Sequence, residues 1–147
     1  MASRFAGDPQ QIDDIAQEIF IRVWRNLGKF RADAPFEHWL ARIATHACYD
    51  FLRKKRRGGT LVPMDEHHAE IPDPPKSTAS ADARERLDRA MRKLSPEERL
   101  VITLAELEEK SLREIADMTG WSEGNVKVRA FRARQSLKKI LEINDER

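Results

Sequence analysis

Residues 111–137 read SLREIADMTGWSEGNVKVRAFRARQSL, and this stretch decides the fold. Its first part predicts a short helix after Ser111, because Ser111 and Glu114 have the spacing of a capping box. Gly120 ends that helix, since glycine adopts the left-handed conformation of a helix C-terminus at little cost. Ser122 can then cap a second helix, whose apolar residues recur at helical spacing. Two short helices around a glycine corner form the helix-turn-helix pattern.

The second of these helices carries a concentrated positive charge. Between Glu123 and Leu141 the chain has six basic side chains and one acidic one, a local balance of +5. A basic helix can lie in the major groove of DNA, where its side chains contact phosphates and base edges. A solvated basic face on a structural helix would have the same composition. The order of capped helix, glycine corner and basic helix favours DNA binding.

The whole chain has the composition of a helical protein with a polar surface. Of its 147 residues, 40% are hydrophobic and 35% are charged. Apolar residues recur at helical rather than alternating spacing, so we expect an all-α fold without a sheet. The formal net charge is only +2, but residues 1–57 carry +4, residues 58–82 carry −4 and residues 83–147 carry +2. An acidic middle segment therefore separates two basic units.

Cysteine content and hydropathy limit the class of protein further. Cys48 is the only cysteine, so no disulfide can form within one chain, which is compatible with a reducing cytoplasm. No apolar run approaches the roughly 18 residues of a membrane span, and the N-terminus lacks the apolar core of a signal peptide. We therefore expect a cytoplasmic protein without membrane insertion.

Two amphipathic helices are predicted within residues 1–57. The earlier helix begins at Gln10 and ends at Gly28, and the later one begins after Pro35 and ends before Gly58. Their apolar stripes are Ile12, Ile15, Ile19, Phe20, Val23, Trp24 and Leu27 in the earlier helix, and Phe36, Trp39, Leu40, Ile43, Ala44, Ala47 and Phe51 in the later one. Two helices cannot bury both stripes on each other, so another surface must cover the remainder.

Five consecutive cations, Arg53 to Arg57, end the later helix. They suit the negative end of the helix dipole, and they equally suit a phosphate-binding cluster. The sequence leaves both interpretations open.

Residues 58–82 are predicted to form a flexible linker, because they contain four prolines, two adjacent glycines and no apolar periodicity. The residue types of transition-metal ligands occur there at Asp65, Glu66, His67 and His68. Adjacent side chains on a flexible segment rarely converge, and no second ligand cluster exists in the sequence. We therefore expect no metal site and no cofactor.

Residues 83–147 are predicted to form a four-helix unit that contains the helix-turn-helix. A helix is expected from about Ala83, and Ser95 with Glu98 forms a second capping box. Trp121 is expected to pack under the corner between the last two helices. The predicted architecture is thus two small helical domains joined by a flexible Pro-rich linker.

The two units together resemble a known family. Residues 14–24 (DIAQEIFIRVW) resemble the polymerase-binding helix of bacterial sigma factors. Residues 36–57 resemble the adjoining helix, which contacts the −10 element of a promoter. Residues 94–99 (LSPEER) and the helix-turn-helix resemble the domain that reads the −35 element. The layout of two units without additional regions is similar to the extracytoplasmic-function group.

The resemblance covers residues 5–57 and 83–141, and it implies two functional domains joined by a linker. Residues 1–57 would bind core polymerase and melt the −10 element, residues 58–82 would be a linker, and residues 83–147 would bind the −35 element. Relatives have about one further helix before the position of Arg4, so the first unit is expected to be incomplete at its N-terminus.

The resemblance also implies which residues make contacts. The polymerase-facing residues would be Asp14, Gln17, Glu18 and Phe20. The −10 element would be held by Lys29, Phe30, Arg31, Trp39, Arg42, His46, Arg53 and Lys54. In the helix-turn-helix, the residues entering the major groove would be Lys127, Val128, Phe131 and Arg132, with Arg129 and Arg134 touching phosphates. Core packing is an equal alternative for Trp39, and a plain exposed aromatic is the alternative for Phe131.

Two positions depart from the family pattern. His46 stands where relatives usually have asparagine, which bears on base capture. Val128 replaces a common small polar residue, so its contact would be apolar, as with a thymine methyl group.

The implied function is an alternative sigma factor, which binds core RNA polymerase and directs it to promoter DNA. An anti-sigma factor is an expected partner, and neither catalysis nor a small-molecule substrate is expected. Two rival functions remain at this stage. One is a stand-alone helix-turn-helix regulator that binds duplex DNA without polymerase, and the other is an interaction protein whose apolar helices dock a partner.

Overall fold

The computed structural model describes residues 2–58 and 78–145, and all the regular structure in these two ranges is helical. The elements are α1 (Ala2–Phe5), α2 (Pro9–Asn26), the 3₁₀-helix η1 (Leu27–Lys29), α3 (Phe36–Gly58), α4 (Thr78–Lys93), α5 (Pro96–Ile102), the π-helix η2 (Thr103–Leu107), α6 (Leu112–Thr119) and α7 (Glu123–Asp145). We call α1–α3 the first unit and α4–α7 the second unit. The all-α prediction is confirmed, while most of the predicted linker, with the histidines at 67 and 68, lies outside the described residues.

The predicted helix starts in the second unit are confirmed by their capping contacts. The Ser95 side chain accepts a hydrogen bond from the Glu98 backbone N–H, and the Glu98 side chain accepts one from the Ser95 N–H. Ser111 and Glu114 exchange the same pair of bonds at the start of α6. These reciprocal bonds satisfy N–H groups that have no partner inside the helix.

The helix α4 begins at Thr78, earlier than the predicted start at about Ala83. The prediction counted Ser and Thr in residues 77–82 as linker residues. No glycine or proline interrupts the chain between Lys76 and Lys93, so nothing in that stretch opposes an earlier helix start.

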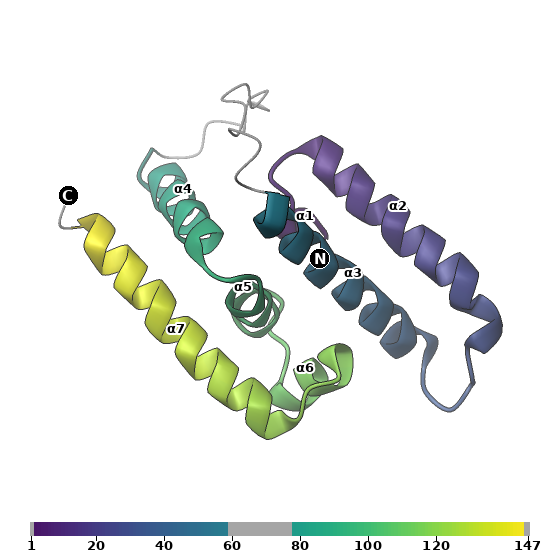
Figure 1. Ribbon diagram of the computed structural model, residues 1–147. Coiled ribbons are helices and arrows are strands. Elements are labelled where there is room, and N and C mark those ends of the chain that lie inside the picture. Colours follow the sequence, from purple (N-terminus) through teal and green to yellow (C-terminus); the bar gives the residue numbers. More distant parts are fainter. Residues whose placement is uncertain (1, 59–77, 146–147) are drawn as a thin grey trace.

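The helix α3 lies at the centre of the molecule and packs on two sides. It lies against α2 on one side and against α5 and α6 on the other (Figure 1). The prediction found only one apolar stripe in this helix. The structure buries a second one, made by Thr45, Cys48 and Leu52, whose spacing of 3 and 4 is also helical. Small and polar residue types made this second face inconspicuous in the sequence.

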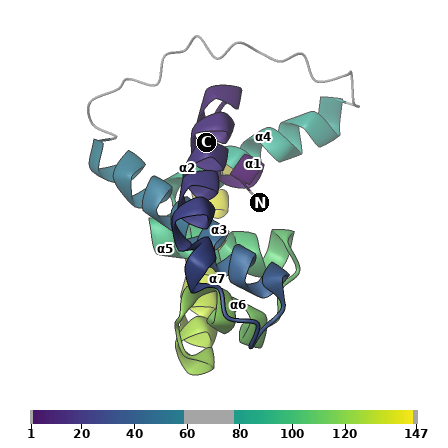
Figure 2. The same ribbon diagram turned by 90° about the vertical axis from the view of Figure 1, so that its right-hand side faces the viewer.

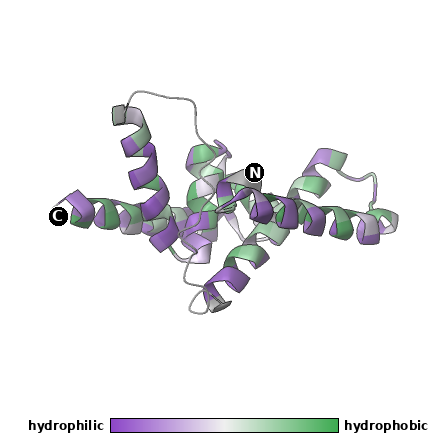
Figure 3. Cartoon of the chain, turned by 90° about the horizontal axis from the view of Figure 1, so that it is seen from above, coloured by the Kyte–Doolittle hydropathy of each residue, from purple (hydrophilic) through white to green (hydrophobic). Residues whose placement is uncertain are grey.

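One apolar core joins the two units. Its fully buried members come from both halves of the chain: Phe5, Ile15, Cys48, Leu52, Leu100, Leu104, Ile115, Met118 and Val126. A smaller cluster joins α4, α5 and α7 within the second unit. Figure 2, seen from the side of α2, places that helix on the outside of the molecule. Both hydrophobic and hydrophilic residues occur along the helices in Figure 3, as expected of amphipathic elements.

The N-terminal segment is part of this junction. Phe5 is completely buried, although the residues around it carry few signals for a helix. Arg99 of α5 donates hydrogen bonds to the carbonyl oxygens of Arg4 and Phe5, at 3.4 and 3.3 Å. The Arg4 guanidinium in turn pairs with Glu108 at 2.8 Å. Polar contacts therefore surround the apolar core at the point where α1 meets the second unit.

Candidate nucleic-acid interface

The corner of the helix-turn-helix has the geometry that the sequence predicts. Gly120 has a φ of 82°, in the left-handed region, and its N–H donates to the Ala116 carbonyl. The Ser122 hydroxyl then accepts a hydrogen bond from the Asn125 N–H at 3.1 Å, which caps α7. These local contacts fix the direction of α7 relative to α6.

The outer face of α7 carries the residues predicted to enter the major groove. Val126, Ala130 and Ala133 are buried against the second unit. The predicted residues lie on the opposite side and are all exposed: Lys127, Val128, Phe131 and Arg132. Phe131 is 62% exposed, so its ring has no packing role within the described chain. This face presents two cations and two apolar groups to any partner.

The two remaining arginines of the prediction each pair with a glutamate of the second unit at the protein surface. Arg129 bonds to Asn125 and Glu97 and lies over the Trp121 ring, 4.3 Å from its centroid. Arg134 pairs with Glu106 at 2.7 Å. In this arrangement both arginines have carboxylate partners of their own, which would compete with phosphate.

An aromatic cluster lies where the first unit turns from η1 into α3. Phe30 contacts Phe36 and Trp39 at ring-centroid distances of 5.5 and 5.3 Å, and Phe36 contacts Trp39 at 5.5 Å. Trp39 is half-buried, so it packs within this cluster and still presents part of its ring. Lys29 and Arg31 flank Phe30 and are exposed.

The other predicted −10 residues lie along α3. His46, Arg53 and Lys54 are exposed, and Arg53 lies over the Tyr49 ring at 5.4 Å. Arg42 is also exposed, and its Nε donates to the Asp117 carbonyl of α6 at 2.9 Å. We call the arrangement in which the two units pack against each other the closed arrangement. In it, the Arg42 side chain is bonded to the second unit.

The predicted polymerase-facing residues of α2, Asp14, Gln17, Glu18 and Phe20, are all exposed. The chain leaves part of the predicted apolar stripe uncovered, because Phe20, Trp24 and Leu27 are 78%, 80% and 48% exposed. Ile15 is the only buried residue of this helix. The helix thus leaves its two aromatic residues, Phe20 and Trp24, on an exposed surface.

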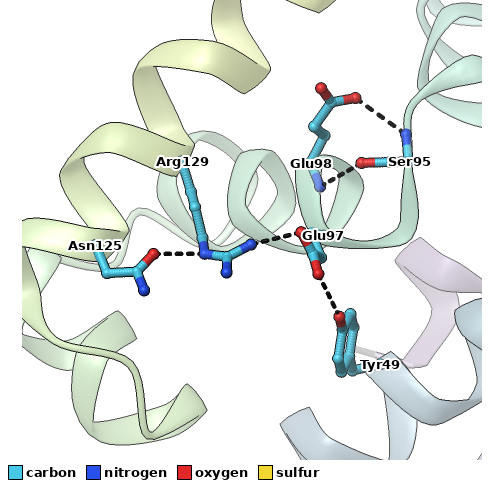
Figure 4. A network of polar contacts seen from close by, with 6 residues as sticks. All are labelled: Tyr49, Ser95, Glu97, Glu98, Asn125 and Arg129. Carbon is cyan, nitrogen blue, oxygen red and sulfur yellow. Dashed lines mark hydrogen bonds and ion pairs between the residues drawn. The ribbon is translucent and has the colours of Figure 1, made fainter.

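A polar network that the sequence did not indicate connects α7 to the first unit (Figure 4). The Tyr49 hydroxyl of α3 donates to Glu97 at 3.1 Å, and Glu97 also accepts a hydrogen bond from Arg129 of α7. Burial and the bond to Glu97 raise the pKa of Tyr49. Tyr49 also meets Trp121 edge-to-face, at 6.1 Å between centroids. Residues 49, 97 and 129 are too far apart in sequence for pattern reasoning to connect them.

Neither metal chemistry nor a membrane span has support in the described ranges. Among residues 2–58 and 78–145, no three side chains of metal-ligand type gather in one place. None of the described helices combines the length and hydrophobicity that a bilayer-spanning segment requires.

Comparison with known proteins places both units in one family. Residues 1–58 match the family model for Sigma-70 region 2, and residues 84–137 match the one for Sigma-70 region 4. RNA polymerase sigma-H factor of Pseudomonas aeruginosa is 32% identical over 149 residues, covering 95% of this chain and 77% of the relative. ECF RNA polymerase sigma factor SigW of Bacillus subtilis is 33% identical over 148 residues, covering 94% and 79%.

Two solved structures resemble the fold. CnrH in complex with the cytosolic domain of CnrY has a TM-score of 0.66 at 27% identity, covering 97% of this chain and 78% of that chain. The sigma factor RpoE in complex with the anti-sigma factor NepR from Bartonella quintana has a TM-score of 0.65 at 24% identity, covering 97% and 88%. The likeness extends over both units.

The Glu97 network predicts that one carboxylate helps to hold the two units together. Cys48 is buried in the joint core and burial raises the pKa of its thiol to about 11, so labelling at pH 8 requires opening. We expect Glu97→Ala to accelerate labelling by up to about fivefold, since an exposed ion pair contributes about 0.2–1 kcal/mol.

Glu106→Ala is the matched control, because Glu106 pairs with Arg134 inside the second unit only. Its labelling rate should equal that of the parent chain. Equal acceleration by both substitutions, or by neither, would contradict a role for Glu97 in closure.

Proposed function

The chain belongs to the extracytoplasmic-function group of the sigma-70 family, and we propose that α2 binds core RNA polymerase while α3 and α7 contact the promoter. As an alternative sigma factor it directs promoter recognition and transcription initiation. Members of this family are initiation factors, and we propose that this chain likewise performs no catalysis of its own. Because core polymerase acts in the cytoplasm, we place the protein there.

The observation that carries the polymerase assignment is the exposed apolar face of α2. Phe20 and Trp24 are one helical turn apart and about four-fifths exposed, and the polar residues Gln17 and Glu18 lie beside them. Large aromatic side chains in such positions are typical of protein interfaces, where tryptophan often contributes most of the binding energy. A polymerase surface would bury this face and explain why the helix leaves it uncovered.

The exposed face of α7 supports reading of duplex DNA. Lys127 and Arg132 can contact phosphates or base edges in the major groove, and Val128 can contact a thymine methyl group. Arg129 would have to leave Glu97 before it could bind a phosphate. Duplex binding by the closed chain alone should therefore be weak.

The aromatic cluster of the first unit supports contact with the opened strand. Phe30 and Trp39 offer ring surfaces on which bases can stack, and Lys29 and Arg31 lie beside them for the phosphates. Proteins generally bind single strands by stacking aromatic side chains on the bases and placing basic side chains along the phosphate backbone.

Simultaneous contact with both promoter elements requires the two units to separate. The −10 and −35 elements lie more than two turns of duplex apart, on the order of 70 Å. In the closed chain α3 and α6 are in direct contact, and Arg42 is bonded to α6. We propose that polymerase binding opens the joint core, and that an anti-sigma partner, as in the two similar complexes, acts on the closed form.

Run-off transcription with core polymerase and a genomic promoter library tests the function as a whole. The chain should direct specific initiation only when core polymerase is present. Tight, sequence-specific binding to duplex DNA by the chain alone, without any effect on initiation, would favour the stand-alone regulator instead.

Replacing Phe20 by alanine should weaken core polymerase binding by about tenfold or more, because an exposed aromatic anchor is lost. The change should leave promoter preference and thermal stability unaltered, since Phe20 makes little contact within the chain. Phe131→Ala is the matched control: it removes an exposed aromatic from α7 and should leave polymerase affinity unchanged. Normal capture of core polymerase by a double variant at Gln17 and Phe20 would contradict the assignment.

Arg132→Ala should weaken recognition of a matching −35 element by about 1–3 kcal/mol of binding free energy. Promoters with that element should be used less as a result. Lys139→Ala, which removes an exposed cation further along α7, should have a smaller effect that is uniform across sequences. Competitive transcription from promoters that differ only at −35 measures the effects of both substitutions. An unchanged preference in the Arg132 variant would argue against insertion of α7 into the groove.

A further inference from the structure

A cleft of about 1090 Å³ lies between the two units, on the side away from the helix-turn-helix corner, and α2, α3, α4 and α5 contribute to its walls. Its most conspicuous feature is a group of six basic side chains from three helices. These are Lys54, Lys55 and Arg56 of α3, Arg92 and Lys93 of α4, and Arg99 of α5. We call them the cleft cations.

The acidic residues of the cleft do not neutralise this group. Three acidic residues line the cleft. Glu18 and Asp50 both pair with Arg22, each at 2.9 Å, at the α2 side. Asp14 of α2 accepts a hydrogen bond from the Gln10 side chain at 3.4 Å. Within the described part of the chain, none of the cleft cations forms an ion pair. The cleft therefore has a strongly positive end where the first and second units face each other.

Arg99 shows that this charge is partly removed from water. Its Nη2 bonds to the carbonyl oxygens of Arg4 and Phe5, but its Nε is buried and has no hydrogen-bond partner in the described chain. Burial and the nearby charge of Arg92 lower the pKa of Arg99, against a smaller opposing effect of Asp88. A half-buried guanidinium with an unpaired N–H is costly unless an acceptor reaches it.

Lys55, on the other side of the cleft, is likewise a partly buried cation. Its ammonium group donates to the Gln11 side chain at 3.3 Å. Burial, followed by repulsion from Arg99 and Arg92, lowers the pKa of Lys55, and Asp8 offsets part of this effect. Lys55 of the first unit thus repels Arg92 and Arg99 of the second unit across the boundary between the units.

The positions of these cations near helix ends do not explain the cluster. Arg92 and Lys93 lie in the last turn of α4, where cations interact favourably with the helix dipole. That interaction is local to each helix end. It does not bring two such ends together.

We propose that the cleft binds a compact anion with several linked phosphate groups, which bridges α3 of the first unit to α4 and α5 of the second. Phosphate oxygens suit guanidinium groups and concentrate negative charge in a small volume. Inorganic polyphosphate and the phosphate chain of a nucleotide share this chemistry. Phe51, Leu94 and Pro96 also line the cleft and offer an apolar wall to a nucleoside. The volume suits a ligand of nucleotide size.

A bridging anion would stabilise the closed arrangement, because it offsets repulsion that exists only when the units are together. Ligand binding would then oppose the opening that promoter contact requires. This regulatory consequence rests on the proposed function, whereas binding of the anion does not.

The test is a titration of the full chain with inorganic triphosphate and, separately, with ATP, at physiological ionic strength and without polymerase or DNA. Calorimetry gives the affinity, and Cys48 labelling reports closure. We expect saturable binding of one anion per chain, and slower labelling when it is bound. Tighter binding of ATP would assign a nucleotide, and equal binding would assign inorganic polyphosphate; both agree with the proposal.

Arg92→Gln and Lys55→Gln should each weaken binding by about tenfold, the loss expected for one charge-assisted contact. Arg92 is exposed, so its variant should fold normally. Lys139→Gln is the matched control, because it removes an exposed cation far along α7, and it should change affinity less than about twofold.

Three results would overturn the proposal. They are the absence of saturable binding, equal weakening in the Lys139 control, and tighter binding of an oligoglutamate peptide than of triphosphate through the same residues. The last result would assign the cleft to an acidic protein segment. All three would leave the polymerase-dependent transcription test unaffected, so the two proposals can fail separately.

Discussion

Burial of Cys48 and Leu52 in one core with Leu100 and Leu104 is the contact on which the rest of the structure depends. Because these residues belong to both units, the two helical units pack against each other around a shared core. The arrangement decides which surfaces are free: α2 keeps its apolar face outside, and the outer face of α7 remains accessible. The same arrangement covers part of the α3 surface, since α3 lies against α6 and Arg42 of α3 is bonded to α6.

The polar contacts around this core involve residues that the resemblance assigns to DNA. Arg129 pairs with Glu97, which also accepts the Tyr49 hydroxyl from the other unit. Each exposed contact of this kind contributes little, about 0.2–1 kcal/mol, so several together can bias the arrangement without making it permanent. A closed state of modest stability suits a protein that must hold two DNA-binding elements together in one context and far apart in another. Repulsion of Lys55 by Arg92 and Arg99 acts in the opposite direction and provides a point at which an anion can intervene.

Much of the fold could be predicted from local signals, because capping residues and helical spacing act over a few positions. The capping boxes at Ser95 and Ser111 and the left-handed Gly120 are examples. The buried side of α2 could not be predicted from spacing alone, since Ile15 and Phe20 belong to the same broad apolar stripe although only Ile15 is buried. The second face of α3 was missed because Thr45 and Cys48 are not conspicuous apolar residues. The Tyr49–Glu97–Arg129 network depends on tertiary packing alone, and the assignment of individual DNA contacts remains a prediction.

The most direct test of closure and opening is the distance between a dye on α2 at position 25 and one on α7 at position 139, measured by single-molecule energy transfer. Both positions are exposed, and the buried Cys48 would not compete for label. We predict one short distance in the free chain and a much longer one, by tens of ångströms, after core polymerase and promoter DNA are added. An equally long distance in the free chain, or no change in a complex that is active in transcription, would contradict the account.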